Sequence, residues 1–108
     1  MYKLLNTPED YTKKFSTCSL ELSQTITECN HTVHSCILPN CMKINRLKSL
    51  IITLQQHSNF IRSYGAYLSN NQIYDIQVIY QLKLANSAIK EFEEMYSKLE
   101  DKNGTSCF

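Results

Sequence analysis

The chain has 108 residues, a length that suits one domain with a single modest core. Hydrophobic residues make up 43% and charged residues 19%, with a formal net charge of +1, which indicates a folded globular protein and excludes a strongly polyionic one. Only two glycines and two prolines are present, so a turn-rich β protein or a glycine-rich phosphate-binding loop is disfavoured.

The first helix is predicted over residues 8–38. Thr7 can cap it, and Pro8 suits the first helical position. Apolar residues then recur every three or four positions, which places them on one face, with a small shift of the stripe after Leu22. These residues are Phe15, Cys18, Leu22, Ile26, Cys29, Val33 and Cys36. Pro39 ends the pattern, because the residue before a proline avoids the α region.

The second helix, predicted over residues 42–69, has the most regular spacing. Its stripe consists of Leu47, Leu50, Leu54, His57, Ile61, Tyr64 and Leu68. Ile51, Phe60 and Tyr67 widen the apolar face, and a face of this width suits a helix with two neighbours. We expect His57, within this stripe, to be a buried or partner-facing histidine rather than a catalytic one.

The third helix is predicted over residues 72–102, followed by a tail at 103–108. Its stripe consists of Val78, Leu82, Ala85, Ile89, Phe92, Tyr96 and Leu99. The joint at residues 69–71 contains serine and asparagine but neither glycine nor proline. A continuous helix through this joint therefore stays open as an alternative.

Three long amphipathic helices with short connections predict an all-α fold of one domain, an antiparallel three-helix bundle with coiled-coil-like spacing. Several apolar residues fall off the stripes or at their edges, and such a surplus often marks a contact surface. The predicted interaction residues are Ile52, Tyr67, Tyr74, Tyr80 and Leu84. We therefore expect packing with protein partners, as a homo- or hetero-oligomer that completes the bundle.

Five residues of the types that bind metals lie close together in the sequence: Cys29, His31, His34, Cys36 and Cys41. Zinc prefers such ligands, but their spacing matches no common zinc motif. On one helix, Cys29 and Cys36 would share the apolar face while the histidines point the other way. We therefore expect no metal site and no other cofactor.

The cysteines also bear on the compartment. Cys36 and Cys41 flank the corner at Pro39 and could form a disulfide in an oxidising environment. An odd total of five cysteines, with Cys107 near the chain end, fits a reducing interior better. No apolar run reaches the roughly 18 residues of a membrane span. The expectation is an intracellular protein of the cytoplasm or nucleus, or a secreted one if a leader preceding Met1 has been removed.

No catalytic signature is present, so we expect a non-enzymatic interaction module or a small structural subunit of a larger helical assembly. The alternative is a secreted or virus-encoded helical ligand or effector, cytokine-like, supported by the disulfide and by two glycosylation sequons at Asn30 and Asn103. A third interpretation is a weak nucleic-acid binder using the basic second helix. Its four basic residues, Lys43, Arg46, Lys48 and Arg62, are too few to favour nucleic acid.

Overall fold

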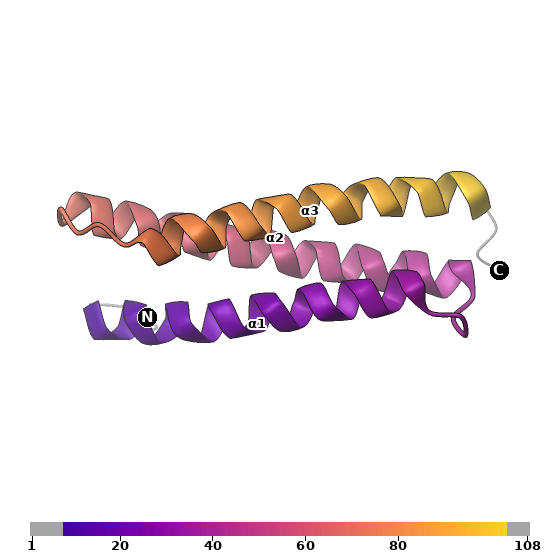
Figure 1. The fold of residues 1–108 in the computed structure, drawn as a ribbon, viewed down its shortest axis with the longest axis horizontal. Helices are drawn as coiled ribbons and strands as arrows, with labels where there is room; N and C mark the ends of the chain where they lie inside the picture. Colours follow the sequence, from indigo (N-terminus) through magenta and orange to yellow (C-terminus); the bar gives the residue numbers. More distant parts are fainter. Residues whose placement is uncertain (1–7, 104–108) are drawn as a thin grey trace, which may run out of the picture.

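The computed structural model describes residues 8–103, and within them the side chains of residues 12–101. The chain forms three helices, α1 (Pro8–His34), α2 (Asn40–Asn70) and α3 (Ile76–Asn103). They lie along the long axis of the molecule, with α2 antiparallel to α1 and α3 (Figure 1). No strand is present in the described range. The predicted all-α three-helix bundle is therefore confirmed. Of the predicted tail at 103–108, Asn103 is the last residue of α3, and residues 104–108 lie outside the described residues.

The core-facing stripe of α1 is more regular than the apolar residues alone indicate. Thr25 and Thr32 are buried, and they continue the alternating spacing of Phe15, Cys18, Leu22 and Cys29. Each threonine hydroxyl donates a 2.8 Å hydrogen bond to the carbonyl four residues earlier, so its burial leaves no unpaired hydroxyl. The predicted shift after Leu22 is therefore wrong, and Ile26 and Val33 lie half-buried at the edge of the stripe.

The first joint begins earlier than predicted. α1 ends at His34 rather than at residue 38, and α2 begins at Asn40 rather than at residue 42. Ser35 explains the early end, because its hydroxyl oxygen accepts hydrogen bonds of 3.1 Å from the backbone N–H groups of Ile37 and Leu38. A serine that bonds nearby backbone groups offers them an alternative to helical pairing.

The second joint separates α2 from α3 with a defined helix end, so the two helices are not continuous. Gln72 adopts a left-handed conformation with φ of 59°. The N–H of Ile73 bonds to the carbonyl of Leu68 at 2.8 Å, and the N–H of Gln72 bonds to that of Ser69 at 3.0 Å. This pair of bonds is a Schellman motif, which satisfies carbonyls at the helix end.

The start of α3 is set by Asp75. Its side-chain Oδ1 accepts a 2.9 Å hydrogen bond from the N–H of Gln77, as expected of an N-cap residue. The third helix therefore begins at Ile76, four residues later than predicted. The asparagines at 70 and 71 end α2 instead of starting α3, because α2 reaches Asn70.

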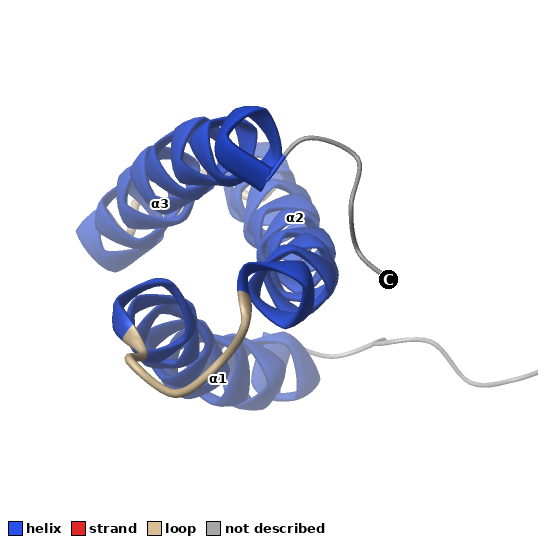
Figure 2. Ribbon diagram, turned by 90° about the vertical axis from the view of Figure 1, so that its right-hand side faces the viewer, coloured by secondary structure: helices blue, strands red, loops and turns tan. Residues whose placement is uncertain are grey.

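α2 is the central helix of the bundle and packs extensively against both other helices, whereas α1 and α3 make few contacts with each other. Viewed end-on, the three helices form an arc with α2 between its neighbours (Figure 2). The fully buried large side chains come from all three helices and are Leu22, Cys29, Leu47, Leu54, Ile61 and Phe92. Every one of them belongs to a predicted stripe.

The α2–α3 interface contains one polar contact and one close backbone approach. The buried Ser58 hydroxyl donates a 3.0 Å hydrogen bond to Oδ1 of Asn86, which helps to fix the register of the two helices. Gly65 faces Val78 so closely that a Cβ at position 65 would lie 3.3 Å from Cγ1 of the valine. The first turns of α3 therefore pack directly against α2.

None of the helices in the described residues combines the length and the apolar character that crossing a membrane requires.

Candidate interaction surface

Exposed apolar side chains gather around the α2–α3 turn and the first two turns of α3. Tyr74, Ile76 and Tyr80 are exposed by 77%, 63% and 59%. Ile73 and Ile79 are exposed by 48% and 42%. We call these five residues the α3 patch. Five large apolar side chains within eight residues, all open to solvent, are unusual, because isolated exposed residues are the norm on a monomer.

The helical register explains why the α3 patch points outward. Val78 is buried against α2, and at 100° per residue Ile76 and Tyr80 lie about 200° around the helix from it. Because Asp75 fixes the first residue of α3, it also fixes this register. One helix face packs on α2, and the opposite face presents apolar side chains to solvent.

The five predicted interaction residues divide into two groups in the structure. Ile52, Tyr74 and Tyr80 are exposed, whereas Tyr67 and Leu84 pack against the core and are half-buried. Only Tyr74 and Tyr80 belong to the α3 patch, since Ile52 lies in the middle of α2. Ile73, Ile76 and Ile79 are exposed as well, although the sequence pattern did not identify them as contact residues. Their close spacing in the sequence could have identified them, because a helix that packs on one side cannot bury apolar residues on both of its sides.

The residues of the metal-type cluster do not converge. Cys29 is buried in the core, whereas His31, His34 and Cys36 are exposed. Across the side chains that the structure describes, no three residues of these types come together in a geometry that could hold a metal ion.

The predicted disulfide between Cys36 and Cys41 is not the one that the structure forms. Cys36 is a free, exposed thiol in the loop after α1, while Cys41, half-buried in the first turn of α2, is disulfide-bonded. Cys18 and Cys29 are also free. The prediction assumed that closeness in sequence would pair the two cysteines, but the early end of α1 turns Cys36 toward solvent. Cys107 lies outside the described residues.

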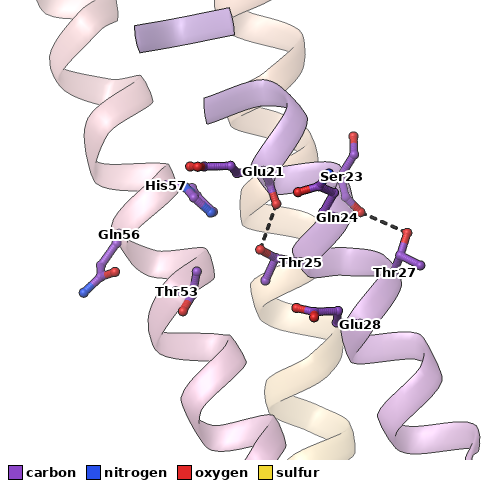
Figure 3. Close-up of a pocket in the computed structure, with 9 residues that line it drawn as sticks. All are labelled: Glu21, Ser23, Gln24, Thr25, Thr27, Glu28, Thr53, Gln56 and His57. Carbon is purple, nitrogen blue, oxygen red and sulfur yellow. Dashed lines mark hydrogen bonds between the residues drawn. The ribbon is translucent and has the colours of Figure 1, made fainter. Parts of the chain in front are cut away.

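A groove of about 750 Å³ runs between α1 and α2 (Figure 3). All nine of its lining residues have polar or charged side chains, among them Glu21, Glu28 and His57. Glu21 and His57 extend toward each other across the groove, whereas Gln56 points away (Figure 3). Small-molecule sites bury most of the ligand surface, so this open groove is a poor candidate for one.

Cys18 and His57 form the one cysteine–histidine contact seen in the described range. Sγ of Cys18 lies 3.6 Å from Nδ1 of His57 and 3.8 Å from its carbonyl oxygen. Burial raises the pKa of the Cys18 thiol to about 11 and lowers the pKa of His57 below 6.5. Catalytic cysteines need a depressed pKa, so the protonation of this pair is opposite to that of a thiolate–imidazolium pair.

The basic residues of α2 do not share one surface. Lys43 is half-buried, and its Nζ donates a 3.5 Å hydrogen bond to the carbonyl of Val33 near the end of α1. A lysine in this position stabilises the carbonyl end of a helix. Arg62 lies about 21 Å along α2 from Lys48 at the helical rise per residue, and its Nη1 bonds to Oδ1 of Asn59 at 3.3 Å.

Comparison with known proteins finds no family model, no curated protein and no solved structure that matches this chain.

Proposed function

We propose that this chain is a non-enzymatic protein–protein interaction module, a small subunit that packs with other helices through the α3 patch. The observation that supports this most directly is the exposure of the patch, with Tyr74, Ile76 and Tyr80 each more than half open to solvent. Tyrosine is enriched at protein interfaces because its ring is apolar and its hydroxyl can find a partner.

Burial of the α3 patch would add measurably to the affinity of a contact. Full burial of an isoleucine or tyrosine side chain is worth about 1.5–3 kcal/mol. Ile76 and Tyr80 are about six-tenths exposed, so covering both would contribute roughly 2–3 kcal/mol. This corresponds to about 30- to 150-fold in affinity.

The non-enzymatic part of the proposal is supported by the chemistry of the most suggestive pair. With the Cys18 thiol protonated and the His57 imidazole neutral at pH 7, neither group is activated for nucleophilic attack. The neighbouring groove is lined by polar side chains and is open to solvent.

The test compares Ile76→Ser/Tyr80→Ser with the matched control Lys90→Ser/Glu94→Ser, which alters two exposed positions further along α3. Serine has nearly the helix propensity of isoleucine and tyrosine, so the fold should be retained. Each tagged variant is incubated with extract of the native source and with a differently tagged copy of the chain, and helicity and Tm are measured in parallel. We expect the patch variant to lose its partners by about 30-fold or more and the control to keep them. Equal recovery of partners by the patch variant would refute the proposal.

A second candidate is a secreted helical ligand or effector, which the disulfide at Cys41 favours because disulfides persist in oxidising compartments. Asn30, in the first sequon, is exposed on α1, while the second sequon extends beyond the described residues. Thiol counting on protein isolated from its source without reductant tests this candidate. Three free thiols would support it, and five would exclude it.

A further inference from the structure

The helical residues of the α3 patch, Ile76, Ile79 and Tyr80, lie between two oppositely charged residues. Asp75 is the N-cap residue directly before α3 and Lys83 follows Tyr80, with Ile79 halfway between the two charges. Residues four apart lie on nearly the same helix face, so Asp75, Ile79 and Lys83 form one row about 12 Å long. Asp75 is half-buried and Lys83 is exposed. Oδ1 of Asp75 caps α3, and its other carboxylate oxygen, Oδ2, supplies a second acceptor.

We infer that the occupant of the α3 patch is a second copy of this chain, packed with its α3 antiparallel to the first. This inference rests on the proposed function and names the partner. A twofold axis near Ile79 pairs each residue with the one equally far on the other side. Asp75 then lies opposite Lys83 of the second copy, and the same pair repeats across the axis. A parallel arrangement would place each carboxylate beside its own counterpart, where like charges repel.

The apolar area agrees with a weak dimer. At about 200 Å² for an aromatic side chain, Tyr74 and Tyr80 expose roughly 270 Å² together. With the three isoleucines, each copy offers on the order of 500 Å², or about 1,000 Å² for the pair of copies. That area lies at the lower end of the range for specific interfaces. We therefore expect a dissociation constant on the order of tens of micromolar. Chain concentration would then set the dimer fraction.

The first test is sedimentation equilibrium of the full chain from about 1 to 200 µM, a range that brackets the expected dissociation constant. We expect a monomer–dimer equilibrium that Lys83→Glu weakens about tenfold, because this change places two carboxylates together at both ends of the interface. Lys90→Glu is the matched control. It makes the same charge change on an exposed position of α3, about 16 Å from the axis, and should leave the equilibrium unchanged.

The second test uses charge complementation between two variants. Lys83→Glu and Asp75→Lys each bring like charges together in their own dimers, but a mixed dimer restores opposite charges at both ends. We expect the mixture to dimerise about tenfold more tightly than either variant alone. The Asp75→Lys chain loses a helix cap, so its helicity is checked by circular dichroism. If it fails to fold, the comparison of Lys83→Glu with Lys90→Glu still decides the outcome.

The outcomes separate this inference from the proposed function. A wild-type chain that stays monomeric at 200 µM refutes the second copy as occupant. If the patch variant nevertheless loses partners from extract, the interaction module stands and its partner is a different protein. A dimer that is abolished by Ile76→Ser/Tyr80→Ser but unaffected by Lys83→Glu refutes the antiparallel register. A monomeric wild type together with unchanged partner capture by the patch variant refutes both.

Discussion

Gly65 provides a sensitive test of how α3 sits on α2. Replacing glycine by alanine inside a helix stabilises it by about 1 kcal/mol. Here the new methyl group would lie 3.3 Å from Cγ1 of Val78, a few tenths of an ångström closer than an ordinary carbon contact. Relieving that contact should cost about 0.5 kcal/mol, which leaves Gly65→Ala a net stabilisation of about 0.5 kcal/mol.

The contribution of the contact is isolated by repeating the substitution in a Val78→Ala background, where Cγ1 is absent. The gain from Gly65→Ala should then rise to about 1 kcal/mol. Free energies of unfolding are measured by urea denaturation followed by circular dichroism. Ser63→Ala, on the exposed face of α2, is the control and should give the same gain in both backgrounds. If Gly65→Ala also has the same effect in both, Val78 does not face Gly65 and the α2–α3 register described above is wrong.

Three further predictions concern the α2–α3 turn and the buried titratable groups. Gln72→Gly should raise the free energy of unfolding by about 1 kcal/mol, since glycine adopts the left-handed conformation without a steric penalty; urea denaturation of both proteins measures it. Burial raises the pKa of both the Cys18 and Cys29 thiols from 9.0 to about 11. Because the unfolded chain loses these protons first, the stability they contribute is complete below pH 9 and is lost between pH 9 and 11, by up to about 2 kcal/mol each. Alanine at either position should reduce that alkaline loss in unfolding experiments at pH 8 and pH 10.5. Burial lowers the pKa of His57, so its contribution is present above pH 6.5 and is lost as the pH falls below that value. His57→Gln should therefore reduce the fall in Tm between pH 7.5 and pH 5, and an undiminished fall would contradict the assignment.

The three helices and most of their buried residues could be predicted from spacing alone. Leu47, Leu54 and Ile61 recur at helical intervals, and the structure buries all three completely. Thr25 and Thr32 could not be found in this way, because their burial depends on hydrogen bonds from their hydroxyls to the carbonyls four residues earlier. These bonds depend on backbone geometry, which a pattern of apolar residues does not contain.

The helix ends and the contact surface were harder to predict. Ser35 and Asp75 move two helix boundaries by four residues each through side-chain hydrogen bonds to the backbone. The later start of α3 also removes Ile73 and Tyr74 from the helix and places them in the exposed turn. Tyr67 is off the main stripe of α2, yet it is half-buried against the core because α2 has neighbours on two sides.

The unequal packing of the three helices determines how the molecule opens. α1 packs mainly against α2, whereas α2 and α3 form a helical hairpin with the more extensive interface. Release of α1 breaks its interface with α2 and its sparse contacts with α3 but leaves the hairpin intact, so it requires less free energy than global unfolding. Backbone amides of α1 should therefore exchange with solvent deuterium faster than those at the centre of α2. The α3 patch belongs to the hairpin and remains available for contact while α1 is released.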